Sequence, residues 1–310
     1  MSCKIYFYIT GGFGNKIFDI ITCLYLVYKY KCKIFVAIRY THHNKDDDPL
    51  IYNLFDNLQK YITFIPLKIL YKIKNTAKEI NFGKYQTLTD LPERLSGNYT
   101  TINKCHMYKF TVDMYNIISK TYLNNAFEFD KQFIPRNELI ISNKDYIAVH
   151  IRYGDKLEIA LEKYNNSNDV KNTTFIIYKP IYYIALINLF LKKTDLPIYI
   201  FTDSKNIVED VILPHVKNSR VKFLDVSYWV SFYLIKNSVF SILSFSTFGM
   251  LAVLLSKKSK HTIILKRPKD DNGHIPEDDL IPFNNMYVIN NKNLILNYDL
   301  PMIKKLHKLI

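Results

Sequence analysis

The sequence predicts an α/β fold in which two regions with parallel sheets flank an irregular middle. Short apolar runs, partly β-branched, alternate with longer segments whose apolar residues recur at helical spacing. This alternation is typical of βαβ units, whose consecutive strands lie parallel. The chain has 310 residues, which is enough for two domains of ordinary size. We place the boundary within 135–145, which predicts domains at 1–140 and 141–310.

The N-terminal region opens as a βαβ unit. A strand-like run leads through a glycine-rich turn into a helical segment, and a second short strand follows; these segments lie at 4–10, 15–30 and 33–38. Secondary structure is less clear in the middle of the chain. The sequence there predicts a polar loop at 40–49, a short helix at 50–60, an extended segment at 62–73 and a second helix at 113–123.

Strands and helices alternate again in the C-terminal region. Strands are predicted at 146–151, 198–201, 221–226, 239–243 and 262–266. Helices are predicted at 180–193, from about 206, and at 228–235, 247–256 and 301–310. The uncharged stretch 237–256 is interrupted by serine and threonine, so we interpret it as a strand, a turn and a buried helix rather than a membrane span.

The net charge of +14 favours anionic partners, since 42 basic residues outnumber 28 acidic ones. The lysines are spread along the chain without a run of five or more, so nucleic-acid binding is a rival interpretation and not the main one. Four cysteines without C-x-x-C spacing predict free buried thiols in a reducing compartment. The N-terminal apolar run is too short for a signal peptide, and we therefore expect a cytoplasmic protein without a transmembrane segment.

Ligands of parallel sheets bind beyond the carboxyl ends of the strands, and four predicted strand ends carry suitable residues. The stretches are Gly11–Asn15, His150–Asp155, Thr202–Ser204 and Ser244–Gly249. In the first, Gly12 and Gly14 begin a G-x-G-x-x-G pattern that residue 17, an isoleucine, leaves incomplete. The turn therefore suits either close approach of a ligand or a simple tight connection.

The second stretch places an arginine at the mouth of a buried strand. Alternation puts His150 and Arg152 on one face, and the guanidinium of Arg152 matches a phosphate in bidentate geometry. A structural pair between Arg152 and Asp155, three residues on, is the alternative. His150 alone is more typical of a hydrogen-bonded core histidine.

The third and fourth stretches add polar groups at the same kind of position. Asp203 caps the next helix or accepts a hydrogen bond from a nucleobase or ribose. Ser246 and Thr247 offer hydroxyl and backbone N–H groups at a helix start, which is an arrangement that binds anions. A separate loop contains His42, His43 and 46–48, an aspartate run that offers metal ligands, although no predicted strand leads into it.

Together the four stretches resemble the superfamily of α1,2-, α1,6- and protein O-fucosyltransferases. The family pattern G-G-x-G-N-Q corresponds to 11–16, and H-x-R-R-G-D-Y of the α1,2 branch corresponds to 150–156. A strand that ends in S/T-D corresponds to Thr202 and Asp203, and S-x-S-T-F corresponds to 244–248. The order and spacing of the four motifs match over most of the chain.

The resemblance implies a GT-B-like fold of two Rossmann-like domains, with parallel sheets that face a central cleft. It implies an inverting transfer of fucose from GDP-fucose to a glycan hydroxyl, with no cofactor and no metal. The N-terminal domain would serve the acceptor and the C-terminal domain the donor. A microbial or viral glycan pathway fits such an enzyme.

The family roles extend to particular residues. The donor-binding positions would be Gly12, Gly14, His150, Arg152, Lys156, Thr202, Asp203, Ser244, Ser246, Thr247 and Phe248. The catalytic positions would be Arg152, on the diphosphate, with Asn15 near the sugar and Asp155 or Glu158 as carboxylates for a general base.

This chain departs from the pattern at three places. Tyr153 stands where the α1,2 signature has its second arginine, Lys156 where it has tyrosine, and Lys16 where it has glutamine. The R-x-x-D-K order is closer to the α1,6 branch. Other functions remain open: a related glycosyltransferase that uses another nucleotide sugar, a lectin-like protein without turnover, or a basic nucleic-acid-binding protein.

Overall fold

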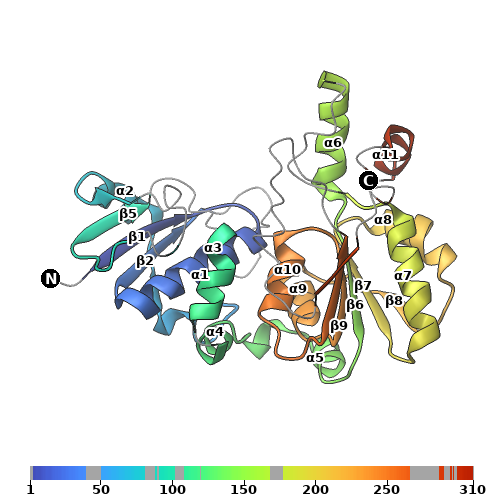
Figure 1. Ribbon diagram of the computed structural model, residues 1–310, viewed down its shortest axis with the longest axis horizontal. Helices are drawn as coiled ribbons and strands as arrows, with labels where there is room; N and C mark the ends of the chain where they lie inside the picture. Colours follow the sequence, from blue (N-terminus) through green and yellow to red (C-terminus); the bar gives the residue numbers. More distant parts are fainter. Residues whose placement is uncertain are drawn as a thin grey trace. The chain divides into compact units, whose positions relative to one another are not determined.

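The structure is a computed structural model. It describes residues 3–39, 50–80, 88, 91–101, 108–118, 120–167, 177–265, 286–289, 294, 296 and 299–309. The described chain forms two compact units, one up to Ile134 and one from Pro135 onward. Each unit is an α/β layer structure built on a parallel sheet (Figure 1), which confirms the predicted fold class.

The first unit contains a five-stranded sheet among the described residues, in the order β3-β2-β1-β5-β4. Its strands are β1 Lys4–Ile9, β2 Lys33–Ile38, β3 Ile62–Phe64, β4 Lys78–Glu79 and β5 Asn98–Thr101, all parallel to their neighbours. Its helices are α1 Phe13–Tyr30, α2 Leu67–Lys74, α3 Tyr108–Ile117 and α4 Lys120–Ala126, with 3₁₀ turns at Leu58–Lys60 and Lys131–Phe133. Inward-facing Ile5, Phe7 and Ile9 of β1 are fully buried and form part of the core.

The second unit contains a six-stranded sheet in its described part, in the order β11-β10-β9-β6-β7-β8. Its strands are β6 Ile147–Ile151, β7 Ile198–Thr202, β8 Val221–Phe223, β9 Phe240–Leu243, β10 His261–Leu265 and β11 Met286–Ile289. Its helices are α5 Arg136–Ser142, α6 Gly154–Ser167, α7 Pro180–Lys193, α8 Lys205–Ile207, α9 Tyr228–Lys236, α10 Thr247–Leu254 and α11 Leu300–His307. A π-helical turn at Val208–Ile212 and a 3₁₀ turn at Leu213–His215 continue from α8.

The strand order of the second unit determines where a ligand can bind. Counted from β6, the order is 3-2-1-4-5-6, which is that of the Rossmann fold. The chain builds the sheet outward from β6 to β8 on one side, and then from β9 to β11 on the other. The direction of winding therefore reverses between β6 and β9, and ligands of such sheets bind at the carboxyl ends of the strands on either side of this switch point.

Several element predictions are confirmed, and those of the middle are wrong in part. The strand at 33–38 and the helix at 180–193 agree with β2 and α7 to the residue. The extended segment predicted at 62–73 is only the short strand β3 followed by α2. Pro66 ends the strand because it lacks an N–H, and it precedes the helix in extended conformation. Ile69, Tyr71 and Ile73 lie on this largely exposed helix, whose apolar pattern is therefore weak.

Other predictions need smaller corrections. The helix predicted at 50–60 is mostly turns that end in the 3₁₀ turn at Leu58–Lys60. The helix predicted at 113–123 is divided into α3 and α4. Among the described residues, no helix is long and apolar enough to cross a membrane, and the uncharged stretch forms β9, a turn and α10 as predicted.

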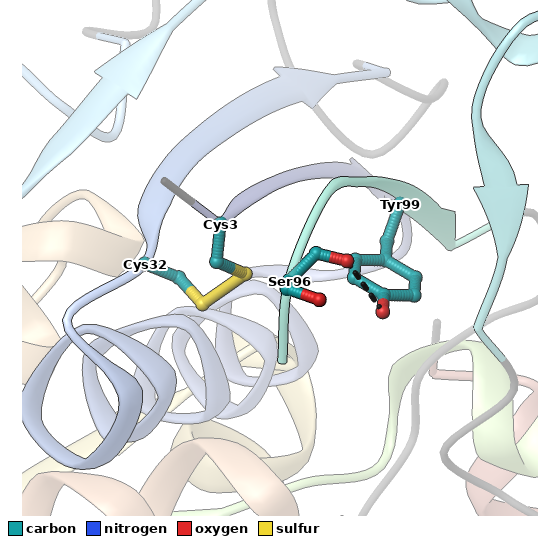
Figure 2. The surroundings of a disulfide bond; sticks show 4 residues. All are labelled: Cys3, Cys32, Ser96 and Tyr99. Carbon is teal, nitrogen blue, oxygen red and sulfur yellow. Dashed lines mark hydrogen bonds between the residues drawn. A yellow bond between two sulfur atoms is a disulfide. The ribbon is translucent and has the colours of Figure 1, made fainter. Parts of the chain in front are cut away.

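The prediction of free thiols is wrong for Cys3 and Cys32, which form a disulfide (Figure 2). The register of β1 against β2 aligns Lys4 with Lys33, so the two preceding cysteines come within 4.7 Å of each other between their Cα atoms. This pairing depends on strand register, which the 29-residue separation does not reveal. Cys23 is a buried thiol, whereas Cys105 lies outside the described residues.

Candidate functional site

Three of the four predicted stretches meet at the carboxyl edge of the second sheet. His150 and Arg152 come at the end of β6, Thr202 ends β7, and Ser244 follows β9 directly. The backbone N–H of Ser244 donates to the carbonyl of His150 at 2.8 Å, which joins the ends of the two strands on either side of the switch point. The order of the strands in the sheet therefore brings these residues together.

Arg152 lies just beyond β6, whose five residues are all buried. Its guanidinium contacts Asp155 through Nη2 and Asp203 through Nη1, each at 2.7 Å. The side chain remains 34% exposed. The structural pair with Asp155 is thus present, and a second carboxylate from β7 joins it. A guanidinium has five N–H donors, so these two contacts leave capacity for a further ligand.

Asp203 fixes the turn between β6 and α6. Its Oδ1 accepts a hydrogen bond from the backbone N–H of Tyr153 at 2.9 Å, in addition to the contact of Oδ2 with Arg152. Ser204 Oγ accepts from the N–H of Gly154 at 2.8 Å. A Cβ at Gly154 would lie 2.5 Å from Asp203 Oδ2, so any other residue there would displace this carboxylate. Asp203 therefore turns back to β6, whereas Thr202 Oγ1 accepts from the N–H of Ser204 at 3.0 Å.

Ser244 is a buried residue that binds the backbone of Arg152. It is 2% exposed, and its Oγ accepts a hydrogen bond from the backbone N–H of Arg152 at 2.8 Å. The same hydroxyl is hydrogen-bonded to the hydroxyl of Tyr183, a buried residue of α7. A chain of contacts thus runs from α7 through the end of β9 to the backbone of Arg152.

His150 is a neutral, buried neighbour of this cluster. Its ring stacks on Phe248 with centroids 5.3 Å apart, and a Cβ at Gly249 would lie 3.0 Å from its Nδ1. Burial, and secondarily the charges of Arg152 and Lys156, lower the pKa of His150 to about 3. Its Nδ1 has no hydrogen-bond partner within the described part of the chain. The imidazole is therefore uncharged at neutral pH.

The start of α10 adds an anion-binding feature beside Arg152. Ser246 caps the helix, because its Oγ accepts from the N–H of Gly249 at 3.3 Å, and Thr247 and Phe248 are half-buried in the first turn. Lys156 reaches this turn from α6, and its Nζ donates to the carbonyl of Phe245 at 2.8 Å. A helix N-terminus with two nearby cations attracts a negatively charged ligand.

The remaining predicted residues are located elsewhere. Gly12, Gly14 and Asn15 belong to the first unit, at the turn from β1 into α1. Gly11 has a φ of +95°, and a Cβ there would lie 3.2 Å from Asn15 Nδ2, so this turn requires glycine. Glu158 is exposed on α6. The loop with His42, which the sequence offers only as a rival metal site, lies outside the described residues, and these contain no group of three or more metal-ligating side chains.

The sequence matches no protein-family model and no curated protein. Solved structures are similar in fold. One is POFUT1 in complex with GDP-fucose, with TM-score 0.51 and 9% identity, over 85% of this chain and 97% of that one. Another is the fucosyltransferase NodZ from Bradyrhizobium, with TM-score 0.51 and 12% identity, over 83% and 94%. This chain has a fucosyltransferase-like fold. The NodZ α-1,6-fucosyltransferase co-crystallised with GDP has TM-score 0.51 and 12% identity, over 87% and 97%.

The fucosyltransferase-like fold confirms the predicted resemblance at the level of architecture. The structure also shows where Tyr153, one of the departures from the family pattern, lies. Tyr153, in the place of a second arginine, is fully buried, and its hydroxyl donates to the carbonyl of Tyr178 at 2.7 Å. Its side chain is thus part of the core. Ser204 and Gly154 lie within the predicted stretches but have no role assigned from the sequence, and Tyr183 lies outside them. Gly154 was visible within its motif, but Tyr183 is 61 residues from Ser244 and no local pattern marks it.

Proposed function

We propose that this chain is a glycosyltransferase that transfers fucose from GDP-fucose to a glycan hydroxyl, with inversion at the anomeric carbon and without a metal. The observation that carries the proposal is Arg152, which is held by Asp155 and Asp203 at the switch point of the second sheet. The fold supports it, because it is shared with structures that contain GDP-fucose or GDP. The proposed donor-binding domain is the C-terminal one.

The chemistry needs a group that stabilises the departing diphosphate. Displacement of GDP builds negative charge on the β-phosphate, and a cation fixed before the reaction lowers the barrier without reorganisation. The two carboxylates and Ser244 fix the head and backbone of Arg152. Lys156 and the N-terminus of α10 supply further positive potential at the same edge. Thr202 and His150 complete the proposed donor site.

The acceptor hydroxyl needs a base. Asp155 is engaged with Arg152, so we assign the role to Glu158, which is exposed four residues after the start of α6. We assign the acceptor side, with Asn15, Gly12 and Gly14, to the first domain. If Glu158→Gln leaves the rate of transfer and its pH profile unchanged, Glu158 is not the base.

A donor panel tests the function. Released nucleoside diphosphate is measured with GDP-fucose, GDP-mannose and UDP-sugars, each with a mixture of glycan acceptors. We expect turnover with GDP-fucose and a loss of roughly 10²–10³-fold in the rate of Arg152→Ala, which is the typical cost of removing one such group. Preference for another donor identifies a related glycosyltransferase. No turnover, together with salt-sensitive binding of DNA or RNA, would favour the nucleic-acid alternative.

A further inference from the structure

Three side chains converge at the carboxyl edge of the first sheet, apart from every motif discussed above. Tyr8 is the penultimate residue of β1, and Arg39 follows β2 directly. The register pairs Tyr8 with Ala37, so Arg39, two residues further on, projects from the same face of the sheet. The N–H of Arg39 donates to the carbonyl of Ile9 at 2.8 Å, which extends the ladder and fixes the position of the arginine.

Helix α2 brings the third side chain to this edge. It packs on β1 and β2 (Figure 1), and it carries Tyr71, which is 57% exposed. Behind these residues, Tyr6 and Phe35 stack with centroids 4.8 Å apart. Aromatic side chains therefore line this face of the sheet, from the stacked pair to the exposed Tyr71.

Arg39 is exposed, and its hydrogen-bond partner is the neutral hydroxyl of Tyr8. This hydrogen bond, with a smaller contribution from Tyr71, raises the pKa of Arg39 above its ordinary value. In the described part of the chain, no carboxylate pairs with Arg39. Arg152 is different, because two carboxylates hold it. Arg39 thus presents an exposed guanidinium that no carboxylate of the described residues neutralises.

We propose that Arg39, Tyr8 and Tyr71 form an acceptor subsite that binds a sugar bearing a carboxylate. The proposal rests on the proposed glycosyltransferase function and specifies its acceptor as an acidic glycan. The planar fork of a guanidinium matches a carboxylate through two parallel hydrogen bonds. Exposed tyrosine combines an apolar ring with a hydroxyl, which suits the mixed surface of a sugar ring.

The test compares two sugars that differ only in the charged group. Cellobiouronic acid and cellobiose are titrated by calorimetry into the full chain with GDP present. We expect cellobiouronic acid to bind roughly tenfold more tightly, and Arg39→Ala to abolish that preference. Arg39→Lys should retain part of it, because the charge remains but the fork is lost. Arg94→Ala is the matched control, since Arg94 is exposed in the same unit and precedes β5 at the opposite edge.

The other outcomes separate a failure of the proposed subsite from a failure of the proposed donor. Equal binding of the two sugars, no binding of either, or an unchanged preference in Arg39→Ala would overturn it. Weaker binding of GDP in Arg39→Ala would make Arg39 a donor residue. A wild-type chain that binds cellobiouronic acid through Arg39 but does not bind GDP would instead overturn the proposed donor, so the two failures are distinguishable.

Discussion

Arg152 is held in a fixed position and is still accessible. Asp155 comes from its own helix α6, whereas Asp203 comes from the neighbouring strand end, and the two contacts restrict the guanidinium from both sides. About one third of the side chain is still exposed. Because the arginine is already positioned, a bound anion does not have to order it, which is the condition for electrostatic stabilisation of a leaving group.

The sequence predicted some of these residue roles and not others. The order His150-x-Arg152 follows a buried strand, and this alone indicated a cation at a sheet edge. The contact between Asp203 and Tyr153 joins residues 50 positions apart, and it depends on the pairing of β6 with β7. A single sequence contains no direct record of that pairing, so Asp203 was interpreted as a cap or a ligand contact.

His150 predicts how stability depends on pH. Its pKa is lowered to about 3 in the folded chain but is about 6.5 when unfolded. The unfolded state therefore binds the extra proton as the pH falls from 6.5 to 3, so stability is complete above that window and decreases within it. We expect His150→Phe, which keeps the stack on Phe248, to reduce the slope of the unfolding free energy against pH. Within the window the reduction is up to roughly 1.4 kcal/mol per pH unit. Urea unfolding at several pH values measures it, and identical slopes would contradict this account.

At the scale of elements, Ser244 connects three of them. Its hydroxyl receives the N–H of Arg152 after β6, it follows β9, and it is bonded to Tyr183 of α7. The backbone of Arg152 is consequently positioned by a residue that is itself buried. The sequence suggested Ser244 as a direct donor contact, and its 2% exposure favours a positioning role instead.

We expect Ser244→Ala to weaken GDP binding by about tenfold, because a buried N–H then loses its partner. Tyr183→Phe should have a smaller effect in the same direction, and Ser244→Thr should retain most of the affinity. Calorimetry with GDP and thermal unfolding are measured on each variant. Tyr199→Phe, on β7, is the control. If the melting temperature falls while GDP affinity stays at the wild-type value, Ser244 is only structural.

Elements with many buried residues could be predicted from the sequence, whereas largely exposed ones could not. The uniformly buried strand β6 and the long helix α7 are clear from their apolar patterns. The short helix α2 buries only Leu70, so its apolar pattern is weak and the sequence predicts an extended segment there. Helix α6 was missed because it begins within the Arg152 motif, whose glycine suggested a turn.

At the scale of the whole molecule, the sequence predicted two parallel α/β regions but not the order of their strands. The 3-2-1-4-5-6 order depends on which side each crossover takes, and local periodicity does not encode that side. Four motifs in the expected order supplied the missing information through their resemblance to a family. The similar solved structures then confirmed the fold.

The disulfide between Cys3 and Cys32 predicts that reduction destabilises the chain. A bridge with a sequence separation of 29 residues restricts the unfolded state, which corresponds to about 3–4 kcal/mol. We expect dithiothreitol to lower the melting temperature of the wild type but not that of a Cys3→Ala/Cys32→Ala variant. Equal melting with and without reductant would contradict the bridge. The result also bears on the compartment, because disulfides persist in oxidising surroundings whereas the predicted cytoplasmic location is reducing.

The most direct test of the central claim is calorimetric titration of GDP and of guanosine into the wild type and Arg152→Ala. The two ligands differ by the diphosphate, so their comparison isolates what Arg152 is proposed to bind. We predict that Arg152→Ala lowers the affinity for GDP roughly tenfold to hundredfold and leaves the affinity for guanosine unchanged. Arg136→Ala, an exposed arginine of α5 in the same unit, should change neither affinity. Equal GDP affinity in the wild type and Arg152→Ala would contradict the account.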